Sequence, residues 1–151
     1  MKKKKRKVNK NTKAYKEKQI KKASNKCLKL WKECIKVQAD YMCEAPDCHE
    51  TKQLNSHHIE SYDLNPYLRH SICNGLCLCA KKHHKFTKYG VHKSGLFILK
   101  MQEIFPERFE ELTKLSTAIE SCKNLAVRDL RYYEVIEQSL LGFLMSDQLN
   151  G

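Results

Sequence analysis

Cysteine and histidine residues gather in residues 43–92, at spacings that suit two kinds of metal chemistry. Cys43 and Cys48 are separated by four residues, and two adjacent histidine pairs follow, His57-His58 and His83-His84. Thiolates can close around zinc, and imidazoles can hold a divalent ion or take a proton from water. We therefore expect a thiolate-rich metal site and a water-activating site in one short part of the chain.

The first expected site holds zinc through three cysteines and one histidine. Cys43 and Cys48 would form a knuckle that presents both sulfurs to one ion, and a second pair of ligands would come from Cys79 and His83. A site with four protein ligands is closed, because no coordination position remains for water. We therefore expect this zinc to be structural.

Two further cysteines compete for the zinc. We expect Cys77 to lie in the core, whereas Cys73 remains an alternative ligand because it is close to the same predicted strand. A simpler interpretation is that all of these cysteines are buried apolar side chains.

The second expected site activates water against a phosphodiester, a reaction that needs a base and a cation that neutralises the phosphate. One histidine of the His57-His58 pair can bind the cation while its neighbour takes the proton, and His84 can face the same cation. The side-chain carbonyl of Asn74 can accept a hydrogen bond from imidazole and fix its tautomer. The other histidines before the second pair are expected to have packing or surface roles: His49 and His70.

The net charge of +12 is concentrated at the N-terminus of the 151-residue chain. Residues 1–26 contain thirteen Lys or Arg and one acid, whereas residues 27–151 contain sixteen of each sign. Like charges with little apolar surface do not fold alone, but they bind polyanions in a salt-dependent way. We expect this arm to bind nucleic acid, and the alternative is a solubilising tail.

The first residues of the chain also bear on the cellular compartment in which the protein is expected. Its charged residues are not followed by the apolar segment of a signal peptide, so we expect a reducing, cytoplasmic compartment and free thiols. Lys3–Val8 resembles a monopartite nuclear localisation signal, which keeps a nuclear location as the second interpretation. No long apolar run is present, so we expect no membrane span.

Hydrophobic periodicity predicts an α+β fold with a small core. Cys27, Trp31 and Cys34 recur at helical spacing and should form one buried stripe. Short strands are expected at 54–60 and 75–79, joined by a polar loop at 61–72. Helices are expected at 14–39, 81–88, 96–104, 106–115 (with Pro106 in the first turn) and after Asn124, which would cap the last one.

Several segments in one order carry a family resemblance: Leu30–Glu33, Cys43-x4-Cys48, Ser56–Ile59, Asn74–Cys79, His83–Phe86 and Val91–Lys93. Together they resemble the HNH endonucleases of the ββα-metal type, in the version found in phage-encoded proteins. The resemblance covers about residues 28–105. It implies a two-stranded hairpin crossed by one helix, with the catalytic ion between them.

The resemblance also implies a role for individual residues. His58 matches the general base, and Asn74 matches the asparagine that orients it. His57 and His84 match ligands of a catalytic divalent ion such as Mg²⁺, Mn²⁺ or Ni²⁺, and His92 would supply the third ligand.

Two departures from the family pattern affect these assignments. Relatives often have a further histidine on the helix, where this chain has Thr87 or Lys88, so His92 takes that place. Many relatives have the fourth zinc cysteine where this chain has Lys82, so His83 substitutes for it. If the register slips by one residue, His83 becomes the catalytic ligand and the zinc site is incomplete.

The sequence thus predicts three parts: a disordered basic arm at 1–15, a nuclease domain with its lead-in helix at 16–105, and a C-terminal helical segment at 106–151. The last would pack on the nuclease or form an interface with a second copy or another protein. DNA is the expected substrate, contacted by these basic residues: Lys3, Lys4, Lys5, Arg6, Lys7 and Lys85. The alternative function is a non-catalytic, zinc-stabilised module that binds nucleic acid.

Overall fold

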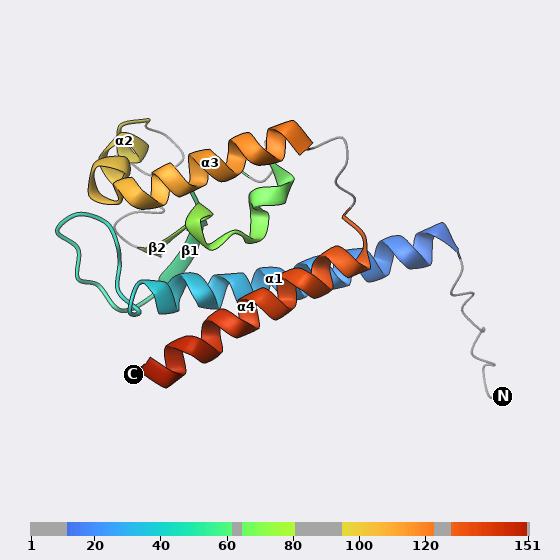
Figure 1. Ribbon diagram of the computed structural model, residues 1–151. Coiled ribbons are helices and arrows are strands. Elements are labelled where there is room, and N and C mark those ends of the chain that lie inside the picture. The colour runs from blue at the N-terminus through green and yellow to red at the C-terminus, as the bar shows by residue number, and fades with distance from the viewer. Residues whose placement is uncertain (1–11, 62–64, 81–94, 123–127, 151) are drawn as a thin grey trace.

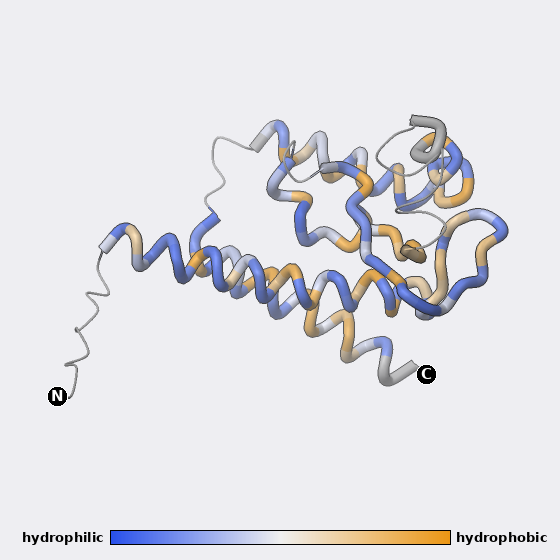
Figure 2. Tube along the Cα trace, turned by 180° about the vertical axis from the view of Figure 1, so that it is seen from behind, coloured by the Kyte–Doolittle hydropathy of each residue, from blue (hydrophilic) through white to orange (hydrophobic). Residues whose placement is uncertain are grey.

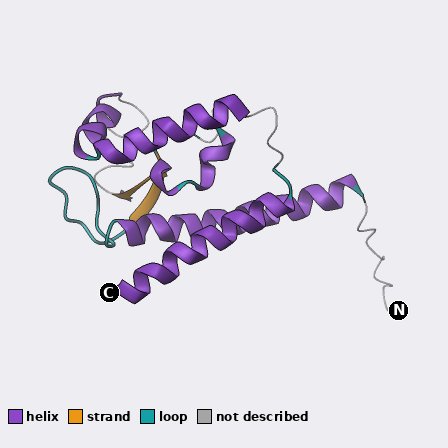
Figure 3. Ribbon diagram, in the orientation of Figure 1, coloured by secondary structure: helices purple, strands orange, loops and turns teal. Residues whose placement is uncertain are grey.

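The computed structural model describes residues 12–61, 65–80, 95–122 and 128–150 (Figure 1). They form a helix-rich fold with one small antiparallel sheet of two strands (Figure 3). In chain order the elements are α1 (Lys13–Gln38), β1 (Leu54–His58), the 3-10 helices η1 (Pro66–His70) and η2 (Ile72–Asn74), β2 (Gly75–Cys79), α2 (Gly95–Ile104), α3 (Pro106–Cys122) and α4 (Leu130–Asn150). This confirms the mixed class, while the helix expected at 81–88 lies outside the described residues.

Helix α1 begins at Lys13, so Lys13–Tyr15 belong to the helix and not to the predicted arm. Thr12 caps it, since its side-chain oxygen accepts a hydrogen bond from the backbone N–H of Tyr15 at 3.3 Å. The predicted apolar stripe is confirmed, because Cys27, Trp31 and Cys34 are fully buried. Half of the lysine-rich segment 1–26 is therefore helical.

The two strands pair antiparallel with Leu54 opposite Cys79 and His58 opposite Gly75. Both strands were predicted, although β1 ends at His58 and not at Glu60. The segment predicted as a polar loop at 61–72 instead contains η1 and the start of η2. Pro66 occupies the first turn of η1, where its fixed φ suits the helix and its missing N–H costs nothing.

The hairpin lies between α1 on one side and α2 with α3 on the other (Figure 1). Leu76 and Leu78 pack with Met101 of α2 and Phe109 of α3, whereas Cys77 packs with the buried residues of α1. Successive side chains of a strand point to opposite faces, which explains the division. The hydropathy colouring of the trace shows apolar positions along both helical layers (Figure 2).

Gly75 allows α1 to approach the sheet closely. A Cβ atom at this position would collide with the side chain of Ile35 and lie 3.1 Å from the indole of Trp31. The glycine that follows Asn74 is therefore required by packing against α1.

Helix α4 runs alongside α1 in the same direction (Figure 1). The thiols of Cys27 and Cys34 donate to the carbonyls of Tyr133 and Leu140 at 3.3 and 3.5 Å. The two cysteines are seven positions apart on α1, and the two carbonyls that they contact are seven positions apart on α4. The two helices therefore stay in register over two turns. The C-terminal segment thus packs on the N-terminal helix.

The caps of the last helices differ in part from the prediction. Pro106 begins α3 as expected, but the helix continues beyond Leu115 to Cys122. Helix α4 is capped by Asp129, whose carboxylate accepts from the N–H of Tyr132 at 2.9 Å. Asn124, the predicted cap, lies outside the described residues.

Candidate functional site

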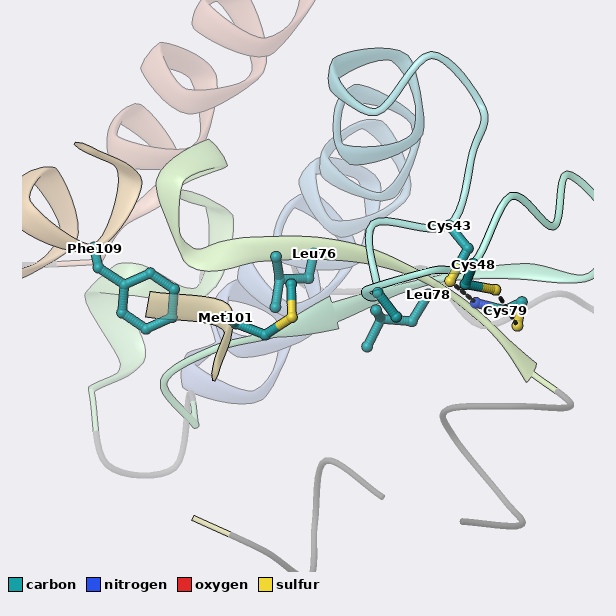
Figure 4. Close-up of a cluster of buried hydrophobic side chains, with 8 residues drawn as sticks. Cys43, Cys48, Leu76, Leu78, Cys79, Met101 and Phe109 are labelled. Atoms are coloured by element: carbon teal, nitrogen blue, oxygen red, sulfur yellow. Dashed lines mark hydrogen bonds between the residues drawn. The ribbon is translucent and has the colours of Figure 1, made fainter. Parts of the chain in front are cut away.

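Three cysteines meet at the end of the hairpin where β2 finishes (Figure 4). The sulfurs of Cys43, Cys48 and Cys79 all lie within 4.8 Å of one another, and those of Cys48 and Cys79 are 3.9 Å apart. Each side chain is buried, with at most 4% of its residue exposed. Cysteines so placed could hold one metal ion such as zinc.

The sulfur spacing fits that ion. Zinc–sulfur bonds of about 2.3 Å in a tetrahedral site place two sulfurs about 3.8 Å apart. Burial raises the pKa of Cys43 to about 12, so this thiol stays protonated without a cation. A divalent ion would reverse this preference, because it stabilises the thiolates that bind it.

The knuckle that carries Cys43 and Cys48 is built from a tight turn. The N–H of Cys48 donates to the carbonyl of Ala45 at 3.2 Å across Pro46 and Asp47. Proline at the second position and a positive φ of 55° at Asp47 are typical of a type II turn. The N–H of Cys43 donates to the carbonyl of Glu50 and closes the base of the knuckle.

The knuckle also covers the outer edge of β2. Glu44 donates its N–H to the carbonyl of Cys77 at 2.8 Å, and its carboxylate accepts the N–H of Cys77 at 2.7 Å. Arg108 of α3 pairs with the same carboxylate at 2.8 Å and donates to the carbonyl of Gly75. The N–H of Cys79 donates to the sulfur of Cys43 at 3.3 Å. The strand edge is therefore satisfied by a largely buried ion pair and by the cysteine site itself.

The two competing cysteines lie elsewhere in the core. Cys77 lies in the core, as predicted, and packs against α1. Cys73 packs with Leu68 and Leu112, and its sulfur lies 3.1 Å from the hydroxyl of Ser71. Among the described residues the clustered sulfurs are therefore those of Cys43, Cys48 and Cys79, while His83 lies outside this part of the chain.

His57 is buried on the face of the hairpin that bears Leu76, its partner on β2. Its Nδ1 lies 2.9 Å from the carbonyl oxygen of His58. Because a carbonyl only accepts, Nδ1 carries the hydrogen and the lone pair of the neutral ring is on Nε2. This arrangement, a backbone carbonyl on one nitrogen, is typical of metal-binding histidines.

His58 faces the opposite side, toward α1. Its imidazole stacks on the indole of Trp31, with ring centroids 4.0 Å apart. Its Nε2 lies 2.9 Å from the carbonyl of Arg69, which places the hydrogen on Nε2 and the lone pair of the neutral ring on Nδ1. Burial lowers the pKa of His58, and the nearby charges of Arg69 and Lys32 lower it further, so the ring is neutral at pH 7.

Asn74 is fully buried. Its side chain makes its hydrogen bonds to the backbone and not to the imidazole of His57 or His58. Its carbonyl accepts the N–H of Glu60 at 2.7 Å, and its amide donates to the carbonyls of Glu60 and Leu68 at 3.1 Å. These bonds close the loop between β1 and η1. Asn74 therefore fixes the backbone just after His58.

Other predicted site residues lie outside the described residues: His83, His84, His92, Lys85, and the arm residues Lys3, Lys4, Lys5, Arg6 and Lys7. His49 is exposed and His70 is buried, as packing or surface roles require. The sequence analysis missed the contact of Trp31 with His58, and the Glu44–Arg108 pair. The position of Trp31 on the predicted buried stripe was a sequence signal for its contact with His58. The sequence had no comparable signal for the Glu44–Arg108 pair.

No helix among the described residues is both long and apolar enough to cross a membrane. Comparisons with protein-family models, curated proteins and solved structures give no match to this chain.

Proposed function

We propose that this protein is a metal-dependent HNH-type endonuclease that hydrolyses phosphodiester bonds of DNA, with His58 as general base. The observation that carries the proposal is the placement of His57 and His58 on one short strand. Each ring has one nitrogen directed at a backbone carbonyl, so each neutral ring has its lone pair on the other nitrogen. The two rings face opposite sides of the strand and suit two different tasks.

The first task is metal binding. His57, together with His84 and His92, would hold a divalent ion such as Mg²⁺, Mn²⁺ or Ni²⁺. When bound, this ion supplies positive charge to the scissile phosphate and the leaving oxygen. The buried environment of His57 excludes water from the side of the ring that faces the core.

The second task is proton removal. His58 would take a proton from water at Nδ1 while Nε2–H stays bonded to Arg69. The resulting hydroxide attacks phosphorus, the bond from phosphorus to the leaving ester oxygen breaks, and that oxygen takes up a proton from a water molecule of the solvent. A neutral ring at pH 7 is ready to act as the base, and its lowered pKa keeps it in that form.

The cysteine site would stabilise this arrangement. Zinc held by Cys43, Cys48, Cys79 and His83 would fix the knuckle to the end of β2. Because binding and folding are coupled in such sites, the metal would contribute to the stability of the hairpin that carries both histidines.

A plasmid cleavage assay tests the proposal. Supercoiled plasmid is incubated with the full chain and Mg²⁺, Mn²⁺ or Ni²⁺ in turn, and products are separated on a gel. We expect nicked or linear DNA with at least one ion and none without added ion. Intact plasmid under all three conditions would contradict the proposal.

A non-catalytic, zinc-stabilised module that binds nucleic acid is the second candidate. The nine lysines of α1 favour it, because they would bind a polyanion whether or not DNA is cut. Tight DNA binding together with intact plasmid in the same assay would select this function.

A further inference from the structure

The exposed face of α1 carries a row of lysines. Lys18, Lys22, Asn25, Lys29 and Lys32 recur at alternating spacings of four and three residues, and all are exposed. At about 100° per residue, these side chains share one side of the helix. The apolar stripe that includes Cys27 and Cys34 lies on the other side, against α4. We call these five residues the lysine face.

Acidic residues lie at the margins of the lysine face, where Glu134 and Glu137 of α4 border the same groove as most of its members. The two acids of α1 are Glu17, which pairs with Lys13, and Glu33, which pairs with Lys36 and accepts the hydroxyl of Tyr41. Lys26 lies toward α4 and pairs with Glu137. Each of these three lysines has a partner, and none of them belongs to the lysine face.

Like charges at this spacing destabilise an isolated helix. Lys18 and Lys22 are four residues apart, and Lys29 and Lys32 are three apart, so each pair repels along the helix surface. Helix α3 shows the usual alternative, an oppositely charged pair of Glu110 and Lys114. A polyanion bound along α1 would turn this repulsion into attraction.

The last residue of the lysine face, Lys32, lies near β1, whereas the candidate base packs against the opposite, apolar side of α1. The backbone carbonyl of Lys32 accepts the hydroxyl of Ser56 at 2.6 Å, two residues before His58 on β1. Trp31, the preceding residue, stacks on His58 itself. A helix rise of about 1.5 Å per residue makes the face about 21 Å long, which matches about six base pairs of duplex DNA.

We propose that the lysine face binds the phosphate backbone of duplex DNA and leads the strand toward β1, which carries His58. This inference rests on the proposed function, since it names the surface that would hold the substrate. It assigns DNA binding to the folded helix in addition to the basic arm predicted from the sequence.

The test compares two variants of the full chain that lose the same charge. One carries Lys18→Gln, Lys22→Gln, Lys29→Gln and Lys32→Gln. The matched control carries Lys52→Gln, Lys100→Gln, Lys114→Gln and Arg131→Gln, four exposed basic residues outside α1. Both are made with His58→Ala to prevent cleavage, and binding to a labelled DNA duplex is followed by anisotropy at several salt concentrations.

We expect the lysine-face variant to bind at least tenfold more weakly than the His58→Ala parent. Its logarithmic salt slope should be smaller by about three to four, because each lost phosphate contact removes about 0.9. The control should change affinity less than threefold. Equal losses in both variants, no loss in either, or a selective loss of binding to vesicles of anionic lipid instead of DNA would overturn the inference.

The outcome is separable from that of the proposed function. If wild-type protein never cuts plasmid but the lysine-face variant alone loses DNA affinity, the surface is confirmed and the nuclease is not. If wild-type protein cuts plasmid and the four glutamines leave binding unchanged, the surface is wrong and the nuclease stands.

Discussion

The indole of Trp31 and the imidazole of His58 lie face to face, with an angle of 6° between their planes. The indole is itself held in place, because its Nε1–H donates to the carbonyl of Ser71 at 2.8 Å. With Arg69 fixing Nε2, the plane and the tautomer of His58 are both set by the fold. Trp31 thus acts as a positioning residue for the proposed base.

Replacing this indole should slow cleavage more than it weakens DNA binding. Trp31→Phe keeps an aromatic ring but loses the bond to Ser71, and we expect a fall in kcat of about tenfold with KM little changed, equivalent to about 1.4 kcal/mol. Leu140→Val, in the α1–α4 interface, is the control for general loss of packing. Wild-type kcat in Trp31→Phe would show that the stacking has no catalytic role.

The cysteine cluster should hold one zinc per chain and stabilise the fold. Cys43→Ser and Cys79→Ser should lose the metal and unfold at a lower Tm, with a loss on the order of several kcal/mol. Cys73→Ser removes a buried thiol outside the cluster and should retain zinc. Elemental analysis and thermal melting measure both quantities, and stoichiometric zinc in Cys43→Ser would rule out the assigned ligand set.

The largely buried pair of Glu44 and Arg108 should couple the knuckle to α3. Arg108→Met leaves the Glu44 carboxylate buried without its cation, so we expect about 3 kcal/mol of destabilisation in urea unfolding. Combining Glu44→Gln with Arg108→Met should restore part of the lost stability, because the uncompensated carboxylate charge is then removed. Lys114→Met, in an exposed pair, should cost at most about 0.5 kcal/mol. Additive effects of Arg108→Met and Glu44→Gln would argue against the coupling.

His70 should make the fold sensitive to acid. The pKa of His70 is lowered to about 4, chiefly by burial; Arg69, His58 and Arg128 contribute to this shift, while the bond from Nε2 to the carbonyl of Ser24 opposes it. The unfolded chain therefore takes up this proton first, and stability falls as the pH drops from about 6.5 toward 4, by about 3 kcal/mol at most. His70→Gln keeps an N–H donor and should make the free energy of unfolding depend less on pH. Urea unfolding at a series of pH values measures this dependence. Exposed His49→Gln is the control, and equal slopes in wild type and His70→Gln would refute the assignment.

Elements with strong local patterns could be predicted from the sequence. Cys27, Trp31 and Cys34 mark one face of a helix, and Gly75–Cys79 is a short apolar run bounded by turn residues, so α1 and β2 were found. The meeting of Cys43 and Cys48 with Cys79 was also predicted from residue types and spacing, whereas the type II turn of the knuckle was not.

Features set by tertiary contact could not be predicted. Glu44 and Arg108 are 64 positions apart in sequence, and no local pattern shows that they meet across β2. The 3-10 helices are too short to show a period, so the segment at 61–72 read as a polar loop. Asn124 and Asp129 are equally good caps by residue type, so the sequence did not single out Asp129, which caps α4.

The central claim, that His58 activates water for DNA cleavage, is tested most directly by single-turnover cleavage of plasmid with saturating protein. Wild type, His58→Ala and the exposed control His49→Ala are compared with zinc-loaded protein and the same divalent ion. We expect His49→Ala to cut at the wild-type rate, and His58→Ala to bind DNA equally well while cutting at least a hundredfold more slowly. Cleavage by His58→Ala at the wild-type rate would contradict the account.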